Sequence, residues 1–146
     1  MTAFKEFSAR FAQSVCVLTH DNFGVKRSCT ISSYSSVSAS TDADIFSFSL
    51  AQNSFMAGIM QESSTVQITL LSHHQSSVAR YYAGNRIDSD YFNIDDVVAE
   101  SIAVVTGTIT RSIPVGSSIL YLTEVENIVL VSVDSRPLVY RLRNFE

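Results

Sequence analysis

Residues 45–50 alternate strictly between two kinds of side chain, and this alternation is the strongest constraint on the fold. In an extended chain, Phe46, Phe48 and Leu50 would lie on one face, and the two serines between them would lie on the other. A period of two is typical of a β-strand that has one face in the core. We therefore predict a strand here, with its aromatic face buried.

Most of the remaining chain also favours strands joined by short turns. The segment 21–24 contains Asn22 and Gly24, which tolerate the positive φ angles of a tight turn, so the strands beside it should form a hairpin. A bend is expected near Glu126 and Asn127, inside the longest strand-like run. Further strands are predicted at residues 15–19, 25–30, 66–71, 102–111, 119–133 and 138–142.

Two helices are predicted on either side of the first strands. Phe4, Phe7 and Phe11 recur at spacings of three and four, which indicates one amphipathic helical segment. Asn53 and Ser54 offer an N-cap for a second helix, which must be short.

A third helix is predicted after the strand at 66–71. The residues at 72–75, Ser-His-His-Gln, match the capping-box pattern and should open a helix that carries Val78 and Ala79 on one face and ends at Gly84. The polar and acidic residues 85–96 that follow predict an irregular surface loop.

The order of these elements predicts a mainly β fold. Strands outnumber helices, and short turns link several of them, so an antiparallel sheet closed or nearly closed into a barrel fits better than alternating β-α-β units. Two or three helices would pack outside the barrel. Because the chain shows no linker and no internal repeat, we expect residues 1–146 to form a single domain.

Composition excludes several classes of protein. With 46% hydrophobic residues and a net charge of -4, the chain does not match a disordered segment. Its 10 Lys and Arg residues are scattered and outnumbered by 14 Asp and Glu residues, so no nucleic-acid partner is expected. The chain has no apolar run of the length of a membrane span and no secretory leader pattern, so we expect a cytoplasmic protein without membrane contact. Cys16 and Cys29 should be buried free thiols.

The familiar catalytic signatures are missing from the sequence. Nucleotide-binding glycine motifs, the nucleophile elbow and the zinc-protease motif are all absent. His73 and His74 would point about 100° apart on a helix, which is poor geometry for one metal ion. Glu124 and Glu126 share a strand face, where carboxylates are usually solvated. We therefore predict no metal site and no hydrolytic site.

Residues 29–38 are the chemically distinctive segment. Six of these ten residues bear an aliphatic hydroxyl. Such a segment, predicted as a loop, can surround a phosphate with neutral hydroxyl and N–H donors. Asn53 and Ser54 would add the partial positive charge of a helix N-terminus. Together these features predict an anion cradle at one end of the barrel; the alternative is a serine-rich strand edge and loop without a ligand.

The order of several motifs resembles the short-chain flavin reductase family, the small reductase components of two-component flavin monooxygenases. The family motif T-a-S-S-f-x-S-V-S is matched between Thr30 and Ser38, and the motif F-A-G appears as Tyr82-Ala83-Gly84. The resemblance runs in the family's order over nearly the whole chain, through segments 4–12, 15–19, 53–54, 71–75 and 137–140.

This resemblance implies an FMN-binding split barrel, antiparallel and Greek-key-like, that usually forms a homodimer with the flavin at the subunit interface. The hydroxyl segment would hold the ribityl chain and the edge of the isoalloxazine ring, and the residues at 53–55 would meet the phosphate. The implied residues for FMN or FAD are Thr30, Ser32, Ser33, Ser36, Val37, Ser38, Ser47, Leu50, Gln52, Asn53, Ser54, Phe55 and Tyr82.

The resemblance also implies an activity, the reduction of the flavin by NADH or NADPH, and an oxygenase partner that receives the reduced flavin. Since the cofactors carry the hydride chemistry, no catalytic residue of the protein is expected. Ser117 and Ser118 stand where many relatives have an acidic residue and a histidine that meets the nicotinamide. This departure keeps a second hypothesis open, a flavin-binding electron carrier without a nicotinamide site. A third, an interaction domain without a ligand, is disfavoured by the intact motifs.

Overall fold

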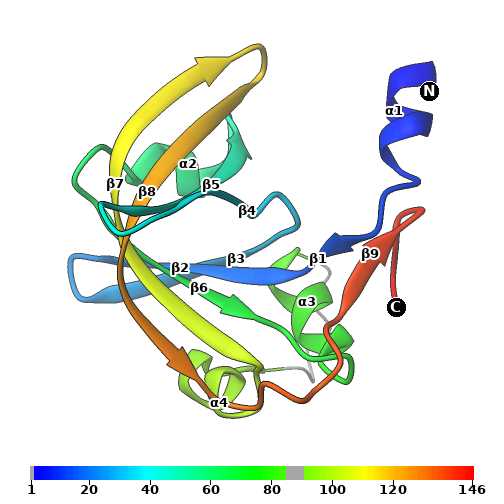
Figure 1. The fold of residues 1–146 in the computed structure, drawn as a ribbon. Helices are drawn as coiled ribbons and strands as arrows, with labels where there is room; N and C mark the ends of the chain where they lie inside the picture. Colours follow the sequence, from blue (N-terminus) through cyan, green and yellow to red (C-terminus); the bar gives the residue numbers. More distant parts are fainter. Residues whose placement is uncertain (1, 85–90) are drawn as a thin grey trace.

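The computed structural model describes residues 2–84 and 91–146, in which strands form two sheets with short helices around them (Figure 1). The larger sheet is antiparallel and has seven strands in the order β3-β2-β6-β7-β8-β5-β4. The predicted mainly β, antiparallel fold is therefore confirmed. The strands are β2 (Cys16–Asn22), β3 (Val25–Ile31), β4 (Ser35–Ala39), β5 (Asp44–Ala51), β6 (Thr65–Leu70), β7 (Ala103–Val115) and β8 (Ser118–Leu130).

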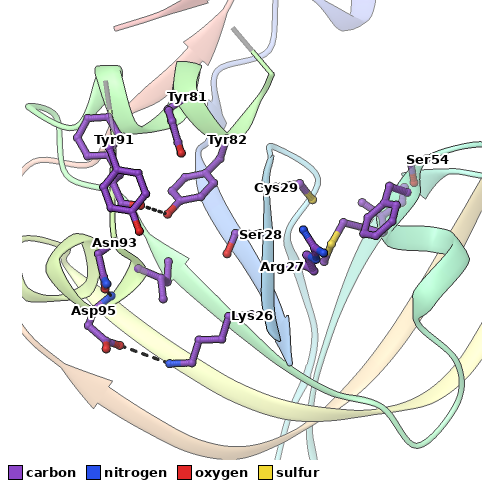
Figure 2. Close-up of a pocket in the computed structure, with 15 residues that line it drawn as sticks. Lys26, Arg27, Ser28, Cys29, Ser54, Tyr81, Tyr82, Tyr91, Asn93 and Asp95 are labelled. Carbon is purple, nitrogen blue, oxygen red and sulfur yellow. Dashed lines mark hydrogen bonds and ion pairs between the residues drawn. The ribbon is translucent and has the colours of Figure 1, made fainter. Parts of the chain in front are cut away.

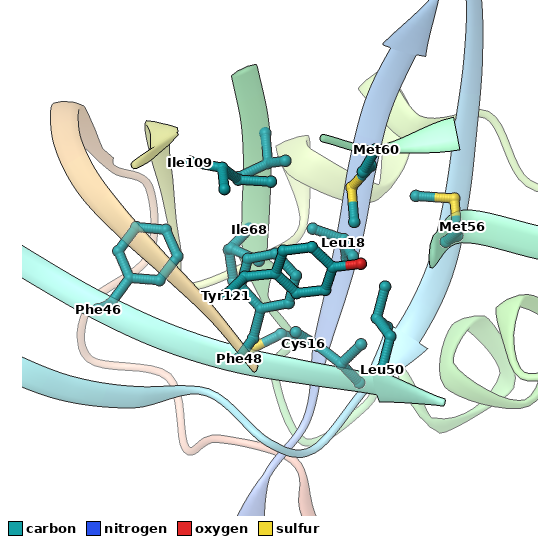
Figure 3. Packing of buried hydrophobic residues seen from close by; sticks show 12 residues of the cluster. Cys16, Leu18, Phe46, Phe48, Leu50, Met56, Met60, Ile68, Ile109 and Tyr121 are labelled. Carbon is teal, nitrogen blue, oxygen red and sulfur yellow. The ribbon is translucent and has the colours of Figure 1, made fainter. Parts of the chain in front are cut away.

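The larger sheet surrounds one apolar core but does not close on itself. Its two edge strands, β3 and β4, are consecutive in the chain, and no ladder joins them within the described residues. Phe46 and Phe48 are 1% and 0% exposed, as the alternation in β5 predicts. Phe48 stacks on Tyr121 of β8 with 4.9 Å between ring centroids (Figure 3). Burying a phenylalanine ring contributes about 1.5–3 kcal/mol, so this strand anchors the core.

The smaller sheet, in the order β1-β9-β10, pairs a segment near the start of the chain with segments near its end. It consists of β1 (Gln13–Ser14), β9 (Val139–Arg141) and β10 (Asn144–Phe145). A second apolar cluster, which includes Val15 and Leu138, lies against the helices that follow β6. The strand predicted at 138–142 is present but shorter.

Four helices are present in the described part of the chain, where two or three were predicted: α1 (Ala3–Ser8), α2 (Phe55–Ile59), α3 (Ser76–Tyr82) and α4 (Ile94–Ala99). The additional helix, α4, begins inside the segment predicted as a loop. It forms because the Asn93 side chain accepts a hydrogen bond from the Asp95 N–H at 2.9 Å, and because Ile94 and Val97 are buried. The remainder of that predicted loop includes residues 85–90, which lie outside the described residues.

The N-terminal helix, α1, differs from the amphipathic segment that was predicted. It ends at Ser8, before Phe11, and it stands apart from the larger sheet (Figure 1). Phe4, Phe7 and Phe11 are all more than half exposed. The spacing of the phenylalanines therefore predicted a helix correctly, but this chain does not bury its apolar face.

The hydroxyl segment also differs from the prediction, because seven of its ten residues lie in strands, three at the end of β3 and four in β4. Ser35–Ala39 forms β4, which pairs with β5. The register shifts between Ser36 and Ser38, which leaves Val37 as a β-bulge. Pairing with β5 makes this segment a short edge strand, although its serines alone are a loop signal.

The bend predicted near Glu126 takes the form of a bulge within one continuous strand. The register between β7 and β8 shifts from the pair Thr106–Asn127 to the pair Gly107–Val125, so that Glu126 is the additional residue. The predicted strand at 119–133 thus remains a single strand, β8, which ends at Leu130.

The capping box predicted at 72–75 forms only in part. The Ser72 N–H donates to Gln75 Oε1 at 3.0 Å, as a capping box requires. The helix, however, begins one residue after Gln75, and the Ser72 hydroxyl donates to the carbonyl oxygen of Glu100 at 3.1 Å instead. The motif therefore ties a turn to the segment after α4.

Two hairpins have tight two-residue loops in which both residues have positive φ. In the hairpin between β2 and β3 these are Phe23 (54°) and Gly24 (86°), and between β9 and β10 they are Leu142 (51°) and Arg143 (63°). Glycine adopts positive φ freely, whereas other residues are strained by about 1 kcal/mol or more. The second hairpin thus holds two strained residues in succession.

Candidate functional site

A cavity of about 740 Å³ lies between β3, the start of α2, the end of α3 and the segment that leads into α4 (Figure 2). Its volume is within the range of roughly 300–1,000 Å³ that is typical of cofactor and substrate pockets.

No helix in residues 2–84 and 91–146 is long and apolar enough to cross a membrane. The same residues contain no cluster of His, Cys, Asp and Glu that could hold a metal ion.

One side of this cavity is polar and positively charged. Arg27 of β3 lies with its guanidinium carbon 5.5 Å from the centre of the Phe55 ring. Next to Phe55, the Ser54 hydroxyl caps α2 by accepting a hydrogen bond from the Ala57 N–H at 3.2 Å. Lys26 also lines the cavity and forms an exposed ion pair at 3.5 Å with Asp95, an acidic residue that lines the cavity as well. The end of the cavity at Arg27 and Ser54 is suited to a negatively charged group.

The other side of the cavity is aromatic. Tyr81 and Tyr82 come from α3, and Tyr91 and Phe92 come from the segment before α4 (Figure 2). The Tyr82 hydroxyl donates to the carbonyl oxygen of Phe92 at 3.1 Å, and the rings of Tyr81 and Phe92 lie 5.4 Å apart. Aromatic walls that are held in place in this way suit a planar ligand.

Four of the residues predicted to bind flavin line this cavity: Leu50, Ser54, Phe55 and Tyr82. They come from three different elements, β5, α2 and α3, and the fold brings them together with the cationic side chains of β3. Asn53, the neighbour of Ser54, is exposed at the start of the turn into α2.

A second, smaller cavity of about 290 Å³ holds Thr30 and Ser32, two further predicted residues. It is also lined by Ala83 of the Tyr-Ala-Gly motif and by Tyr140 and Arg143 near the end of the chain. The structure thus divides the predicted flavin residues between two cavities, on either side of the end of α3.

Other predicted residues are engaged in the fold itself. The Ser33 hydroxyl bridges β5, since it donates to the carbonyl oxygen of Ser49 at 3.1 Å and accepts from the Ser49 N–H at 3.0 Å. The Gln52 side-chain amide donates to the carbonyl oxygens of Gly116 and Ser118 at 2.9 and 3.2 Å. The Ser33 side chain thus holds the segment after β3 against β5, and the Gln52 side chain holds the segment after β5 against the turn between β7 and β8.

The remaining predicted residues lie on β4 and β5. Ser36 and Val37 are exposed on β4, and the Ser38 hydroxyl donates to the carbonyl oxygen of Ala43 at 3.4 Å. Ser47 is 9% exposed, although the alternation placed it on the outer face of its strand.

Sequence reasoning missed Lys26, Arg27 and Tyr81 as cavity residues. Two adjacent basic side chains directly before the hydroxyl segment were the available signal, because the whole chain has only 10 Lys and Arg residues. Tyr81 carried no comparable signal, because its place depends on how α3 packs against β3.

The two thiols differ in their relation to the site. Cys29 lines the larger cavity, and burial raises its pKa to about 11. Cys16 is part of the apolar core, where burial raises its pKa to about 12. Both thiols are therefore protonated at neutral pH. Their prediction as free thiols is confirmed, although Cys29 is only partly buried.

The structure thus combines an open, antiparallel seven-stranded sheet with a cavity that has cationic and aromatic lining residues. A family model described as "Flavin reductase like domain" matches residues 8–146. The chain therefore belongs to the flavin reductase-like family of flavin oxidoreductases. A comparison with curated protein sequences finds no match.

Solved structures of flavin reductases have the same fold. The flavin reductase PheA2 matches with a TM-score of 0.84 at 20% identity, over 100% of this chain and 97% of that chain. The flavin reductase of styrene monooxygenase from Pseudomonas putida matches with a TM-score of 0.84 at 18% identity, over 99% and 96%. The NADH:FAD oxidoreductase SgcE6 from Streptomyces globisporus, solved with NAD and FAD fragments, matches with a TM-score of 0.81 at 18% identity, over 98% and 89%.

Proposed function

We propose that the protein reduces FMN or FAD with NADH or NADPH and supplies the reduced flavin to a partner monooxygenase. The observation that carries this proposal is the larger cavity, which combines Arg27 with aromatic side chains and contains Ser54 and Tyr82, two of the predicted flavin residues. A flavin nucleotide has the matching chemistry, a planar ring system joined to a phosphate.

The described residues fit a flavin in the larger cavity. Arg27 and Ser54 would contact the phosphate, since both lie at the charged end of the cavity, and the ring system would lie toward Tyr82 and Leu50. Gln52, Asn53 and Phe55 would support that end. Thr30, Ser32, Ser33, Ser36, Val37, Ser38 and Ser47 complete the proposed flavin site along β3, β4 and β5.

A bound flavin would supply the redox chemistry, with a nicotinamide nucleotide as the source of the hydride. The chain's own part is to hold two ring systems face to face and to exclude water. No catalytic residue is therefore proposed.

The alternative, a flavin-binding electron carrier, rests on Ser117 and Ser118. In the structure Ser117 lies in the turn between β7 and β8, where its carbonyl oxygen accepts a hydrogen bond from the Gln52 N–H at 2.9 Å, and Ser118 is the first residue of β8. A serine hydroxyl lacks the ring and the charge of the histidine and acidic residue that many relatives carry there. The reductase hypothesis therefore requires other residues to bind the nicotinamide nucleotide.

We also propose that residues 1–146 act as one domain of a cytoplasmic homodimer, without nucleic-acid or membrane partners. Apolar side chains are exposed in a continuous run at the end of β8 and on α1, which a monomer would leave in water. Subunit contact would cover them. The oxygenase that would receive the reduced flavin is a further partner.

The decisive experiment follows the flavin spectrum of the purified protein. Added FMN or FAD should shift its visible absorbance on binding, and anaerobic addition of NADH or NADPH should then bleach it. If neither flavin binds, both the reductase and the carrier hypotheses fail. If a bound flavin keeps its colour with both nicotinamides, the carrier hypothesis replaces the reductase hypothesis.

A variant of Ser36 tests the contribution of the hydroxyl segment. Ser36 is exposed on an edge strand, so Ser36→Leu should leave the fold intact while its larger side chain obstructs the flavin. We expect flavin affinity to fall at least about 10-fold, measured by fluorescence titration, with an unchanged circular dichroism spectrum. Unchanged affinity would show that β4 takes no part in flavin binding.

A further inference from the structure

The turn at residues 72–75 contains a buried side-chain amide that the proposed flavin site does not use. Gln75 is 2% exposed, and Ser72 is fully buried. Gln75 Oε1 accepts a hydrogen bond from the Ser72 N–H at 3.0 Å, and Gln75 Nε2 donates to the carbonyl oxygen of Val97 at 3.0 Å. A backbone N–H only donates and a carbonyl oxygen only accepts, so these two partners fix the orientation of the amide.

Both side chains of this turn hold the C-terminal end of α4. Gln75 contacts the carbonyl oxygen of Val97 in the last turn of the helix, and the Ser72 hydroxyl donates to the carbonyl oxygen of the C-cap residue Glu100 at 3.1 Å. A helix leaves its last carbonyl groups without partners of its own. Because α4 has only six residues, it is not stable by itself in water. Its position therefore depends on these hydrogen bonds and on the burial of its apolar side chains.

The N-terminal end of α4 forms part of the larger cavity. Asn93 and Asp95 line this cavity at the start of the helix (Figure 2). Phe92, on the aromatic side of the cavity, comes directly before them, and its carbonyl oxygen accepts the hydrogen bond from Tyr82 of α3. The aromatic side is thus assembled from α3 and from the segment that leads into α4. Gln75 contacts this side only through α4.

We propose that Gln75 is a positioning residue for the larger cavity. Its amide holds α4 against the start of α3 and thereby sets the separation of the two segments that carry the aromatic side chains. The inference rests on the proposed function, because a flavin ring placed toward Tyr82 fits only at one such separation. Small displacements of groups that hold a ligand reduce binding and reaction rate strongly.

Three variants separate positioning from stability. Gln75→Met keeps nearly the same volume and removes both hydrogen bonds of the amide. Ser72→Ala removes the hydroxyl and keeps the amide, and this smaller change remains informative if Gln75→Met does not fold. Ser101→Ala is the matched control. Ser101 is fully buried, and its hydroxyl donates to the carbonyl oxygen of Val98 at 2.8 Å, so its hydrogen bond lies within the α4 segment and does not reach α3.

Two measurements follow the variants. Hydrogen–deuterium exchange of the ligand-free protein reports how firmly α4 is held, and fluorescence titration with FMN reports on the cavity. We expect Gln75→Met to speed exchange of the α4 amides and to weaken FMN binding, each about 10-fold, and Ser72→Ala to act in the same direction with a smaller effect. Ser101→Ala should lower the midpoint of thermal unfolding by about 2–4 °C, yet change FMN affinity less than about 2-fold.

Two outcomes would overturn the proposal. In one, α4 of the Gln75→Met and Ser72→Ala variants exchanges no faster than α4 of Ser101→Ala. In the other, α4 exchanges faster but FMN binds as tightly as in the wild type, which would make the turn a purely structural element. If the wild-type protein does not bind FMN, the proposed function itself fails. That outcome is distinguishable, because the exchange measurement needs no ligand and still decides whether Gln75 holds α4.

Discussion

Gly107 shows how one residue allows the sheet to change register. It lies in β7 next to the bulge at Glu126, and a Cβ added to it would be 2.6 Å from the Glu124 carbonyl oxygen and 2.9 Å from Thr123 Cγ2. The closer of these two atoms belongs to the backbone, which cannot turn aside as a flexible side chain can. Glycine is needed here for the close approach of two strands.

We predict that Gly107→Ala destabilises the protein by about 1–3 kcal/mol, because β7 and β8 must move apart to admit the methyl group. Urea denaturation measures the change. Gly58→Ala is the matched control: Gly58 lies within α2, the position of its methyl group has no neighbour within 4 Å beyond the adjacent residues and the backbone of the helix itself, and alanine favours helices. The control should be neutral or more stable. Equal stability of both variants would contradict the close contact.

Cys29 reports on the larger cavity through its ionisation. Burial disfavours the thiolate and raises the pKa from 9.0 to about 11, so the folded protein keeps this proton where the unfolded chain loses it. The contribution of this group to stability is therefore complete below pH 9 and is lost as the pH rises through about 11.

The same shift predicts slow alkylation of Cys29. Its thiolate fraction at pH 8 is lower than that of an ordinary thiol by roughly 100-fold, so iodoacetamide should modify it correspondingly slowly, and faster as the pH rises toward 11. Because Cys29 lines the cavity, FMN should slow the reaction further. Peptide mass spectrometry measures it, with Cys16 as the internal control. Rapid modification that FMN does not affect would contradict this placement.

At the scale of elements, α2 combines a structural and a proposed binding role in one cap residue. Ser54→Ala removes the acceptor for the Ala57 N–H and should cost about 1 kcal/mol of stability. Ser54→Asp keeps an acceptor but adds a negative charge at the end of the cavity where Arg27 lies. We predict that Ser54→Asp retains stability and loses flavin affinity more severely than Ser54→Ala does.

Thermal unfolding and FMN titration of the two Ser54 variants provide the measurement. The comparison separates capping from binding, because only the phosphate contact is sensitive to the sign of the charge. If both variants bind FMN as the wild type does, the flavin phosphate lies elsewhere than at the start of α2.

The sequence predicted elements where a local pattern decides the structure. The strict alternation at 45–50 identified β5, and Asn53-Ser54 identified the start of α2. Local sequence patterns gave wrong predictions where contacts between residues distant in the chain decide the secondary structure. Serines at 35–38 signal a loop, yet pairing with β5 makes them a strand. Similarly, α4 depends on burial of Ile94 and Val97 against residues far away in the chain.

Residues of the candidate site could be predicted only where they belong to a recognisable sequence motif. Thr30, Ser32, Ser54 and Tyr82 were identified from motif resemblance, and the structure places them around two cavities. Tyr81 could not be found from sequence, because its place in the larger cavity depends on how α3 packs against β3.

At the scale of the whole molecule, the exposed apolar run on β8 predicts association. Ile128, Leu130 and Val133 are 56%, 68% and 56% exposed, and they lie near the end of the strand. We predict a dimer by analytical ultracentrifugation, and a shift toward monomer in Leu130→Lys, because a buried lysine in the interface is costly.

Phe23→Lys is the matched control for the dimer prediction. Phe23 is 100% exposed, but it stands alone at the tip of the hairpin between β2 and β3. Its replacement should leave the mass of the particle unchanged. A wild-type protein that sediments as a monomer at every concentration would contradict the homodimer.

The open side of the barrel has a further consequence, for solubility. β4 is an edge strand and could recruit a strand from another molecule, but it is only five residues long, is interrupted by the bulge at Val37 and carries three serines. Short length, bulges and polar side chains all discourage edge-to-edge addition. The serines that are proposed to hold flavin therefore also protect the unliganded protein from aggregation, so apolar replacements along β4 threaten both properties.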